Sequence, residues 1–297
     1  YKSATQEHFE DTEKQIIKEL ELCRYVICDK QPLIVSSKGA ILKKSGGVRL
    51  IHDCSRPSGY SVNSYADKQS FKYTTVDKAV ELLPNDGWMA KIDLSSAYRS
   101  VPIHPSNVPY MGLQWTFSGD VKPTYFTDTR LPFGGTECPE KFQRITNAVC
   151  RMMLRRGYTA ISYLDDFLII ASNQEECQLA YEELLSLLQS LGFTINWDKA
   201  VPPAQILTFL EIEIDSIRRT LSLPPEKLEE IQSILSIWLD KKKATKEQLQ
   251  QLIGKLSWAA RMVKAGRPHL RRLLTAMTSL KSKHHHIRIC KDTRADI

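Results

Sequence analysis

The residues that most clearly predict chemistry are two adjacent acids, Asp165 and Asp166, which end the run Tyr-Leu-Asp-Asp. Apolar residues flank this pair on both sides, and strand interiors disfavour aspartate. Two neighbouring carboxylates also repel each other unless a cation neutralises them. One interpretation is a tight hairpin that holds both acids at its tip beside a metal ion. The other is an ordinary turn between two strands, since Asp-Asp is a common turn dipeptide.

A third acid, Asp93, favours the metal-binding interpretation. It lies near the end of a separate short apolar run, residues 88–94. Magnesium prefers hard oxygen ligands and shares its coordination shell with substrate phosphates. Two such ions can activate an attacking 3′-oxygen and stabilise a leaving pyrophosphate. Three carboxylates at the ends of two strands therefore predict a site for two Mg²⁺ ions, with Mn²⁺ as a substitute.

The elements that must position these acids follow from the hydrophobic pattern. Two β-rich runs around a turn at residues 45–47 predict a hairpin, whose second strand places Arg49 and Asp53 on one face. A second hairpin is expected from Val108–Phe117 and Val121–Leu131. Further strands are expected at residues 88–94, 160–164, 167–170, 193–197 and 206–214. Helices are expected at residues 6–22, 75–83, 139–156, 176–191 and 228–239, and from Thr245 and Pro268 onward.

Length and composition indicate a globular protein with one large domain or two smaller ones. The 297 residues are 42% hydrophobic and 25% charged, which excludes a disordered tail, a fibrous repeat and a coiled-coil rod. The central apolar run at residues 167–171 is far too short for a membrane span. Seven cysteines without a Cys-x-x-Cys pair and the lack of a leader predict an intracellular protein that is not secreted. Because the first residue is Tyr, we also expect an excised piece.

Charge is distributed unevenly along the chain. Residues 216–297 hold 18 Lys and Arg against 7 Asp and Glu, a net charge of +11. The whole chain carries +7, so residues 1–215 carry −4. This asymmetry predicts a polyanionic partner for the C-terminal third, with a merely solvated basic surface as the alternative.

The motifs, taken in order, resemble those of retroelement reverse transcriptases over residues 38–280. The matching segments are KIDLSSAY at 91–98, LPFGG at 131–135 with the helix through 142–144, YLDD at 163–166, GFTINWDK at 192–199 and TFLEIEI at 208–214. GKLSWAAR at 254–261 and GRPHLRR at 266–272 resemble the tyrosine-recombinase class of retrotransposons in particular. By this resemblance Asp93, Asp165 and Asp166 bind the metal ions, with the Leu94 carbonyl as a further ligand.

The resemblance also implies where an incoming nucleotide lies. Arg49 and Lys44 would grip its triphosphate, with Lys43 as the alternative to Lys44. Tyr98 would exclude a 2′-hydroxyl and so favour deoxynucleotides, unless it is only a core tyrosine at a strand-to-helix bend.

In the motif at 208–214, this chain has Glu211 where the family commonly has Gly.

Three further roles complete the implied site. Phe133 and Gly134 would lie under the nucleotide and the template base. Lys199 would be a general acid for the leaving pyrophosphate, and a surface lysine is the alternative.

The helix from Thr245 presents two different faces. Gln250, Gly254 and Trp258 share one face by their spacing, and the other face holds Leu249, Leu252, Ile253 and Leu256. Glycine inside a helix costs about 1 kcal/mol relative to alanine, so Gly254 should serve a purpose. By resemblance, it lets the helix backbone approach the minor groove of a duplex. Close packing against another helix is the alternative explanation.

The resemblance implies an α+β fold, a right-hand polymerase with fingers, a palm of antiparallel sheet with helices, and an all-helical thumb. The expected parts are an N-terminal helical extension at 1–30, fingers at 31–71 and 102–136, palm at 72–101 and 137–221, thumb at 222–280 and a loose basic tail at 281–297.

The implied activity is RNA-directed DNA polymerisation, with an RNA template, a DNA primer or RNA/DNA hybrid, and dNTPs as partners. The cytoplasm, the nucleus or a virus-like particle would be its setting, and the oligomeric state is open. The alternatives are a catalytically silent fold that binds nucleic acid, an RNA-dependent RNA polymerase and a palm-type nucleotide cyclase.

Overall fold

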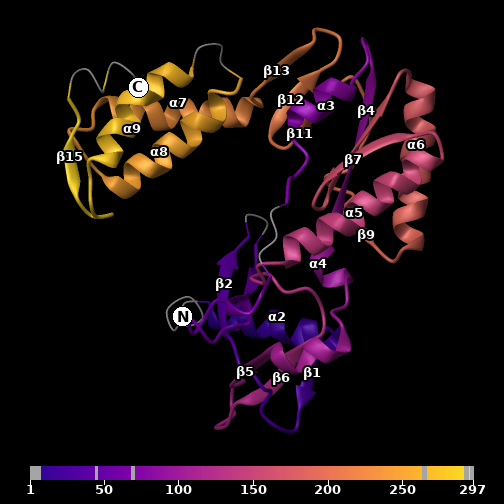
Figure 1. The fold of residues 1–297 in the computed structure, drawn as a ribbon, viewed down its shortest axis with the longest axis vertical. Helices are drawn as coiled ribbons and strands as arrows, with labels where there is room; N and C mark the ends of the chain where they lie inside the picture. Colours follow the sequence, from indigo (N-terminus) through magenta and orange to yellow (C-terminus); the bar gives the residue numbers. More distant parts are fainter. Residues whose placement is uncertain (1–7, 44–45, 68–70, 263–265, 291–293, 295–297) are drawn as a thin grey trace. The chain divides into compact units, whose positions relative to one another are not determined.

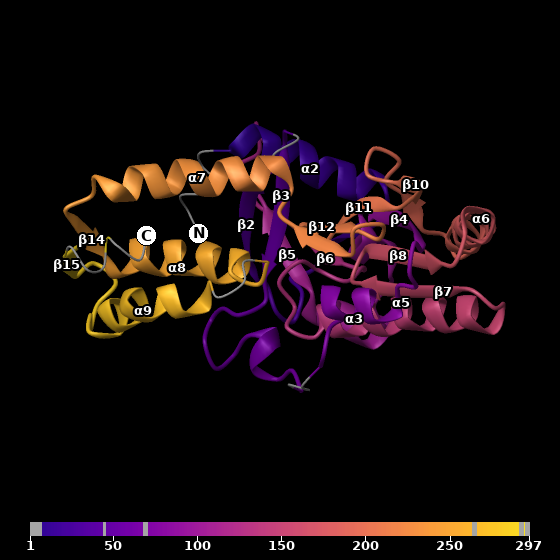
Figure 2. The same cartoon turned by 90° about the horizontal axis from the view of Figure 1, so that it is seen from above.

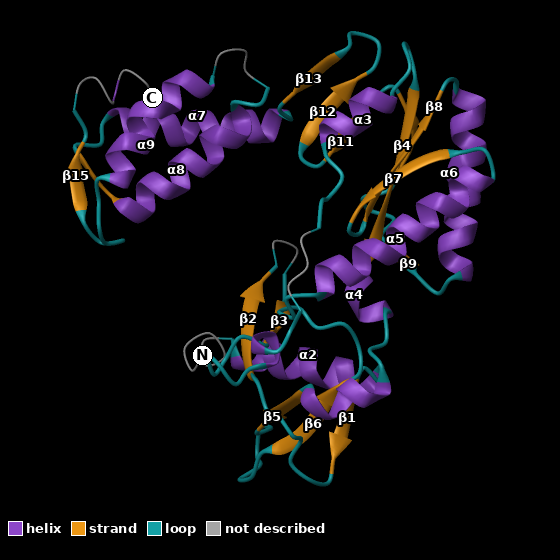
Figure 3. Ribbon diagram, viewed as in Figure 1, coloured by secondary structure: helices purple, strands orange, loops and turns teal. Residues whose placement is uncertain are grey.

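A computed structural model describes residues 8–43, 46–67, 71–262, 266–290 and 294. The chain forms two compact units, residues 1–83 with 88–203 and residues 84–87 with 204–297. Helices and antiparallel sheets alternate along the chain, as Figures 1 and 3 show. No helix among the described residues is both long enough and apolar enough to cross a membrane.

The first unit contains a five-stranded sheet that carries the acids. Strands β10, β4, β8 and β7 lie in that order, and β9 pairs with the end of β4. Their bounds are β4 Trp88–Ser95, β7 Thr159–Tyr163, β8 Asp166–Ala171, β9 Thr194–Ile195 and β10 Val201–Ala204. The strands predicted around the acids are therefore confirmed, whereas the strand predicted at 193–197 is only two residues long.

Helices α5 (Cys138–Arg155) and α6 (Gln174–Ser190) pack on this sheet. Phe142 and Leu184 of these helices and Phe167 of β8 are fully buried in one core. The predicted ends of both helices hold, since Gly157 and Gly192 follow them with φ near +89° and +82°.

The short helix α3 (Val76–Leu82) lies in the same unit. Its predicted cap is confirmed, because the Thr75 hydroxyl oxygen accepts from the Lys78 N–H.

The other part of the first unit combines a three-stranded sheet, a helix and a hairpin. The sheet has the order β1, β6, β5, and the predicted hairpin is β2 paired with β3. The bounds are α2 Phe9–Glu21, β1 Tyr25–Cys28, β2 Ser37–Leu42, β3 Val48–Asp53, β5 Gly112–Trp115 and β6 Thr124–Asp128, with a 3₁₀ turn η1 at Val62–Ser64. Their shared core consists of Ile16, Tyr25, Leu113, Trp115 and Phe126.

The strand predicted at Val108–Phe117 is wrong in its first half. Residues 105–110 form the 3₁₀ helix η2, and β5 begins only at Gly112. Pro105 and Pro109 have no N–H to donate to a sheet, so this stretch cannot continue the ladder. The hairpin itself is confirmed, because β5 pairs with β6.

The second unit begins with a small antiparallel sheet, β11 (Ile206–Phe209), β12 (Ile212–Asp215) and β13 (Thr220–Ser222). The single strand predicted at 206–214 is therefore wrong. Leu210 and Glu211 both have positive φ, +50° and +63°, and turn the chain back on itself. This conformation favours glycine, and two residues with a Cβ adopt it here. Lys227 lies 3.3 Å from the Glu211 carboxylate.

Three helices form the rest of the second unit: α7 (Pro225–Leu239), α8 (Lys246–Ala259) and α9 (Arg271–Thr278), with η3 (Arg267–Leu270) before α9. Figure 2 shows these three α-helices side by side. The capping box predicted at the start of α8 is present, since the Thr245 side chain accepts from the Gln248 N–H and the Gln248 side chain accepts from the Thr245 N–H.

A two-stranded sheet completes the helical unit, which was predicted to be all-helical. Strand β14 (Lys243–Thr245) pairs with β15 (His286–Arg288). Ile289 is 5% exposed and joins the core around Trp238 and Leu252. Within the predicted loose tail, β15 and Ile289 are therefore attached to the unit, although most of residues 281–290 are exposed. Strands of only three residues, each with a single apolar residue, are too short for alternation to be visible in the sequence.

Lys38 is an unusual buried lysine on β2. Its side chain is 8% exposed, and its Nζ lies 4.4 Å from the centre of the Phe126 ring and 4.9 Å from that of Trp115. Burial lowers the pKa of Lys38 to about 7. The two rings offset only part of the cost of desolvating the ammonium.

Because its pKa is lower in the folded state, Lys38 makes stability dependent on pH. Between about pH 7 and 10 the unfolded chain binds the extra proton, so the free energy of unfolding rises with pH. We expect Lys38→Met to raise the free energy of unfolding at pH 6 by on the order of 3 kcal/mol relative to the wild type. This gain should shrink towards pH 10. Urea unfolding at pH 6 and pH 9 measures this, with exposed Lys43→Met as the matched control. A Lys38→Met gain that is equal at both pH values would contradict the assignment.

Candidate active site

The three acids lie where strand β4 ends and strand β8 begins, in the middle of the five-stranded sheet. Strands β4 and β8 are antiparallel, and their register places Asp93 directly opposite Asp166. The Leu94 N–H donates to the Asp165 carbonyl oxygen at 3.0 Å, which fixes β4 against the turn between β7 and β8. Leu164 and Asp165 form that two-residue turn. The hairpin with acids at its tip is therefore present.

A buried glutamine on α5 holds this turn. Gln143 Oε1 accepts from the Leu164 N–H at 2.6 Å, and its Nε2 donates to the Ser162 carbonyl oxygen at 3.0 Å. Leu164 has φ +52°, a left-handed conformation that costs roughly 1–2 kcal/mol in a residue with a Cβ. Gln143 compensates part of that cost. The sequence analysis included Gln143 in a motif but assigned it no role. Gln143 is only 1% exposed, and a buried amide must be hydrogen-bonded, which indicates a structural role. That burial is visible only in the fold.

Burial and mutual repulsion raise the pKa values of two of the acids. Burial raises the pKa of Asp166 to about 6; the Lys91 ammonium opposes this shift, and the charges of Asp165 and Asp93 add to it. The pKa of Asp165 is also raised, mainly by burial and further by Asp93. A divalent cation would relieve this repulsion, so the crowded carboxylates are a donor set that fits one.

Two lysines and an asparagine contact the acids in this structure. Lys91 Nζ lies 3.2 Å from Asp166 Oδ1, and Lys199 Nζ lies 3.2 Å from Asp93 Oδ2. Asn196 Nδ2 donates to Asp93 Oδ1 at 2.8 Å. Within the described part of the chain, no three His, Cys, Asp or Glu side chains converge as ligands for one metal ion. Lys91 and Lys199 therefore engage carboxylate oxygens that a metal ion would use.

Lys199 combines features of both interpretations made from the sequence. Its side chain is 61% exposed, as for a surface lysine, yet its ammonium reaches the buried carboxylate of Asp93. Sequence reasoning missed Asn196 and Lys91, since neither contact follows from spacing along the chain.

Three residues predicted to contact a nucleotide form a continuous stack from three separate segments. The Tyr98 ring lies parallel to the Phe133 ring, with 5.2 Å between centroids and 15° between planes. On β3, the guanidinium carbon of Arg49 lies 5.2 Å from the centre of the Phe133 ring. The Phe142 ring of α5 lies beside the Tyr98 ring, with 5.1 Å between their centroids. Burial raises the pKa of Tyr98, so the ring stays neutral.

Gly134 allows the loop after Phe133 to approach β3 closely. The Phe133 carbonyl oxygen accepts from the His52 N–H at 2.8 Å. A Cβ added at Gly134 would lie 2.0 Å from the His52 carbonyl oxygen, and Gly134 has φ +133°. Only glycine fits this position. Asn63 Nδ2 donates to the Gly134 carbonyl oxygen at 2.9 Å and holds the loop from the other side.

Two lysines were predicted as the partner of Arg49. Lys44 lies outside the described residues, and its alternative Lys43 is exposed and directly follows β2. At the end of β3, Asp53 Oδ1 accepts from the Ser55 N–H at 3.2 Å, and Asp53 Oδ2 lies 3.6 Å from Arg56 Nε.

In the second unit, α8 presents the two faces that the spacing predicts. Leu249, Leu252 and Ile253 are buried, whereas Gln250 and Gly254 are exposed and Trp258 is half-buried. A Cβ added at Gly254 meets no atom within 4 Å. Close helix packing, one of the two explanations left open for this glycine, is therefore excluded among the described residues.

Comparison with known proteins identifies relatives of the chain. A family model described as reverse transcriptase (RNA-dependent DNA polymerase) matches residues 5–214. The Gag-Pol polyprotein of avian reticuloendotheliosis virus is 28% identical over 182 residues, which are 60% of this chain and 15% of that protein. Protein P of duck hepatitis B virus (strain China) is 24% identical over 195 residues, 63% of this chain and 23% of that protein. The chain thus spans less than a quarter of either relative.

Two solved structures share the fold. One is the foamy viral protease-reverse transcriptase dRH in complex with double-stranded DNA, with a TM-score of 0.76 and 16% identity, covering 94% of this chain and 44% of that one. The other is the foamy viral protease-reverse transcriptase in complex with an RNA/DNA hybrid, with a TM-score of 0.71 and 18% identity, covering 91% and 33%. The predicted α+β fold class is confirmed.

Proposed function

This chain belongs to the reverse transcriptase (RNA-dependent DNA polymerase) family, and we propose from that premise that it extends a primer along an RNA or DNA template using dNTPs. The observation that best supports this is the strand register that sets Asp93 opposite Asp166, with Asp165 at the adjoining turn. Retention of all three acids argues against a catalytically silent fold that only binds nucleic acid.

Asp93, Asp165 and Asp166, with the Leu94 carbonyl oxygen, would hold two Mg²⁺ ions, for which Mn²⁺ can substitute. Such ions, when bound, activate the attacking 3′-hydroxyl and stabilise the leaving pyrophosphate. The chain's own part is to hold the carboxylates at the adjoining ends of β4 and β8. Lys199, whose ammonium lies 3.2 Å from Asp93 Oδ2, would be the general acid for the leaving pyrophosphate.

The stack of Arg49, Phe133 and Tyr98 would receive the nucleotide. Arg49 offers a planar cation to the triphosphate, with Lys44 as its partner. Phe133 and Gly134 would lie under the nucleotide and the template base, and the Tyr98 ring would exclude a 2′-hydroxyl.

Nucleic acid is the proposed partner of the second unit. The foamy viral structures are complexes with double-stranded DNA and with an RNA/DNA hybrid. A duplex along the exposed face of Gln250, Gly254 and Trp258 would meet the basic C-terminal third of this chain, whose net charge is +11.

Finer assignments are proposed on the sequence motifs. We assign fingers to 31–71 and 102–136, palm to 72–101 and 137–221, and thumb to 222–280. The segment at 254–272 supports the tyrosine-recombinase class of retrotransposons, for which an intracellular setting or a virus-like particle is appropriate.

Primer extension on an RNA template tests the function. The full chain is incubated with Mg²⁺ and either dNTPs or ribonucleotides, and Asp166→Ala is the inactive control. We expect extension with dNTPs only. Equal extension with ribonucleotides would identify an RNA polymerase, and no extension by a folded protein that binds duplex would identify a silent fold.

Gly254 permits a separate prediction about the duplex. Gly254→Ala should stabilise α8 by up to about 1 kcal/mol, because the new methyl group meets no neighbour. The same change should shorten DNA products, and Gly254→Leu should shorten them further, because both bring side chains toward the duplex backbone.

Product length in the presence of a nucleic-acid trap and thermal unfolding of the full chain measure the two effects. The matched control is Gln232→Leu, at an exposed position of α7. Products of unchanged length from a stabilised Gly254→Ala protein would contradict a duplex on this face.

A further inference from the structure

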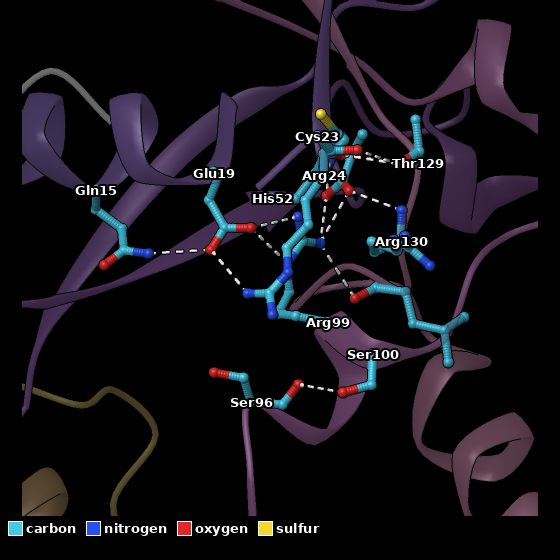
Figure 4. Close-up of polar contacts among 12 residues, drawn as sticks. Gln15, Glu19, Cys23, Arg24, His52, Ser96, Arg99, Ser100, Thr129 and Arg130 are labelled. Atoms are coloured by element: carbon cyan, nitrogen blue, oxygen red, sulfur yellow. Dashed lines mark hydrogen bonds and ion pairs between the residues drawn. The ribbon is translucent and has the colours of Figure 1, made fainter. Parts of the chain in front are cut away.

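One buried arginine joins the short helix that carries Tyr98 to two distant elements of the first unit, as Figure 4 shows. Arg99 belongs to α4 (Ala97–Ser100) and is 7% exposed. Its guanidinium lies between the carboxylates of Glu19 on α2 and Asp128 at the end of β6. Neither the three acids nor the nucleotide stack includes this group.

The contacts fix the guanidinium in both direction and plane. Arg99 Nε and Nη2 donate to Glu19 Oε2 at 3.0 and 2.8 Å. Arg99 Nη1 donates to the two carboxylate oxygens of Asp128 at 2.9 and 2.8 Å and contacts the Leu131 carbonyl oxygen at 3.4 Å. Tyr25 covers one face, with its ring centre 5.3 Å from the guanidinium carbon. Charge-assisted, fork-shaped contacts of this kind are the most directional that proteins make.

The two carboxylates are themselves held in place. Gln15 Nε2 donates to Glu19 Oε1 at 3.0 Å, and Arg24 lies 3.7 Å from the same oxygen. The Arg130 N–H donates to Asp128 Oδ1 at 3.0 Å. The anchor for Arg99 is therefore built into α2 on one side and the end of β6 on the other.

Helix α4 needs such an anchor. It has four residues, too few for a helix to be stable alone, and Ser96 before it has φ +53°. Tyr98, the neighbour of Arg99, stacks on Phe133, which lies two residues after Leu131. Arg99 thus belongs to the segment that supplies the Tyr98 ring and contacts the segment that supplies the Phe133 ring.

We propose that Arg99 is a positioning residue for the nucleotide sugar pocket, and that α2 takes part in nucleotide selection through Glu19. The proposal rests on the proposed function, in which the Tyr98 ring excludes a 2′-hydroxyl. Arg99 sets the distance between the Tyr98 ring and the sugar; it does not touch the substrate.

The measured quantity is the ratio of kcat/KM for a dNTP to that for the matching ribonucleotide. A change that only destabilises the protein lowers the active fraction and leaves this ratio unchanged. Arg99→Lys keeps a charge but cannot bridge both carboxylates. We expect it to lower the ratio about tenfold, since a displacement of about 1 Å at a reacting centre can cost up to about 100-fold. Glu19→Gln keeps the shape of the side chain and should lower the ratio in the same direction.

The matched control is Glu13→Gln, the same change on the same helix. Glu13 accepts from Trp115 Nε1 at 3.1 Å and from the Ser118 N–H at 2.9 Å, and the Arg99 contacts do not include it. The Glu13→Gln variant should have the wild-type ratio of kcat/KM for the dNTP to that for the ribonucleotide. If Arg99→Lys and Glu19→Gln both retain the wild-type ratio, the positioning role is overturned.

A second arm tests whether the effect passes through Tyr98. In a Tyr98→Val background, Arg99→Lys should cause no further fall in the ratio, because the ring it positions is gone. Additive effects would overturn the proposal. A wild-type chain that extends no primer would instead refute the proposed function, so the two failures are distinguishable.

Discussion

Asp93→Asn and Asp165→Ala are each expected to reduce primer extension by at least about 10³-fold, because catalysis by this site depends on preorganised charge. The fold should survive both changes. Burial and neighbouring charge raise the pKa of Asp165, so removing its carboxylate relieves repulsion. The unfolding temperature of Asp165→Ala should therefore equal or exceed that of the wild type.

Asp93→Asn should behave differently in one respect. The Asp93 side chain accepts from Asn196 and contacts Lys199, so an amide there loses an ion pair and turns a donor toward a lysine. A small loss of stability should accompany the loss of activity. Thermal unfolding and extension assays on the same preparations separate the two effects.

The control for both variants is Asp120→Asn, at an exposed turn of the first unit. It should retain wild-type extension. If either Asp93→Asn or Asp165→Ala extends primers at more than a tenth of the wild-type rate, the assignment of the three acids is wrong.

Local chemistry made the positions of the acids predictable. The Asp-Asp pair and Asp93 are conspicuous because aspartate is costly in apolar strands. The caps at Thr75 and Thr245 were equally visible, because capping depends on residues three apart. Each of these signals lies within a few residues of the feature it predicts.

Contacts between distant segments were not predictable. Gln143 supports a turn 21 residues away, and Arg99 joins carboxylates 80 and 29 residues away. The turn at Leu210 and Glu211 was missed for a different reason. Neither residue prefers positive φ, and the surrounding hairpin imposes it, so no local signal marks the reversal.

The Tyr98 ring should decide which sugar the proposed polymerase accepts. Tyr98→Val is expected to lower the preference for dNTPs over ribonucleotides by about 100-fold, because a smaller side chain leaves space for the 2′-hydroxyl. The ring also packs between Phe133 and Phe142, so its loss should reduce stability as well. Competition between a dNTP and its ribonucleotide on one primer measures the preference independently of the active fraction.

Tyr98→Phe is the matched control, since it removes only the hydroxyl group. If the bulk of the ring excludes the 2′-hydroxyl, Tyr98→Phe keeps the wild-type preference and Tyr98→Val loses it. If a hydrogen bond from the phenol were responsible, both variants would lose it. A Tyr98→Val protein with the wild-type preference would show that the sugar lies elsewhere, and the stack with Phe133 would then be a packing feature of the first unit. The pair of variants therefore separates steric exclusion from hydrogen bonding and from simple packing in one experiment.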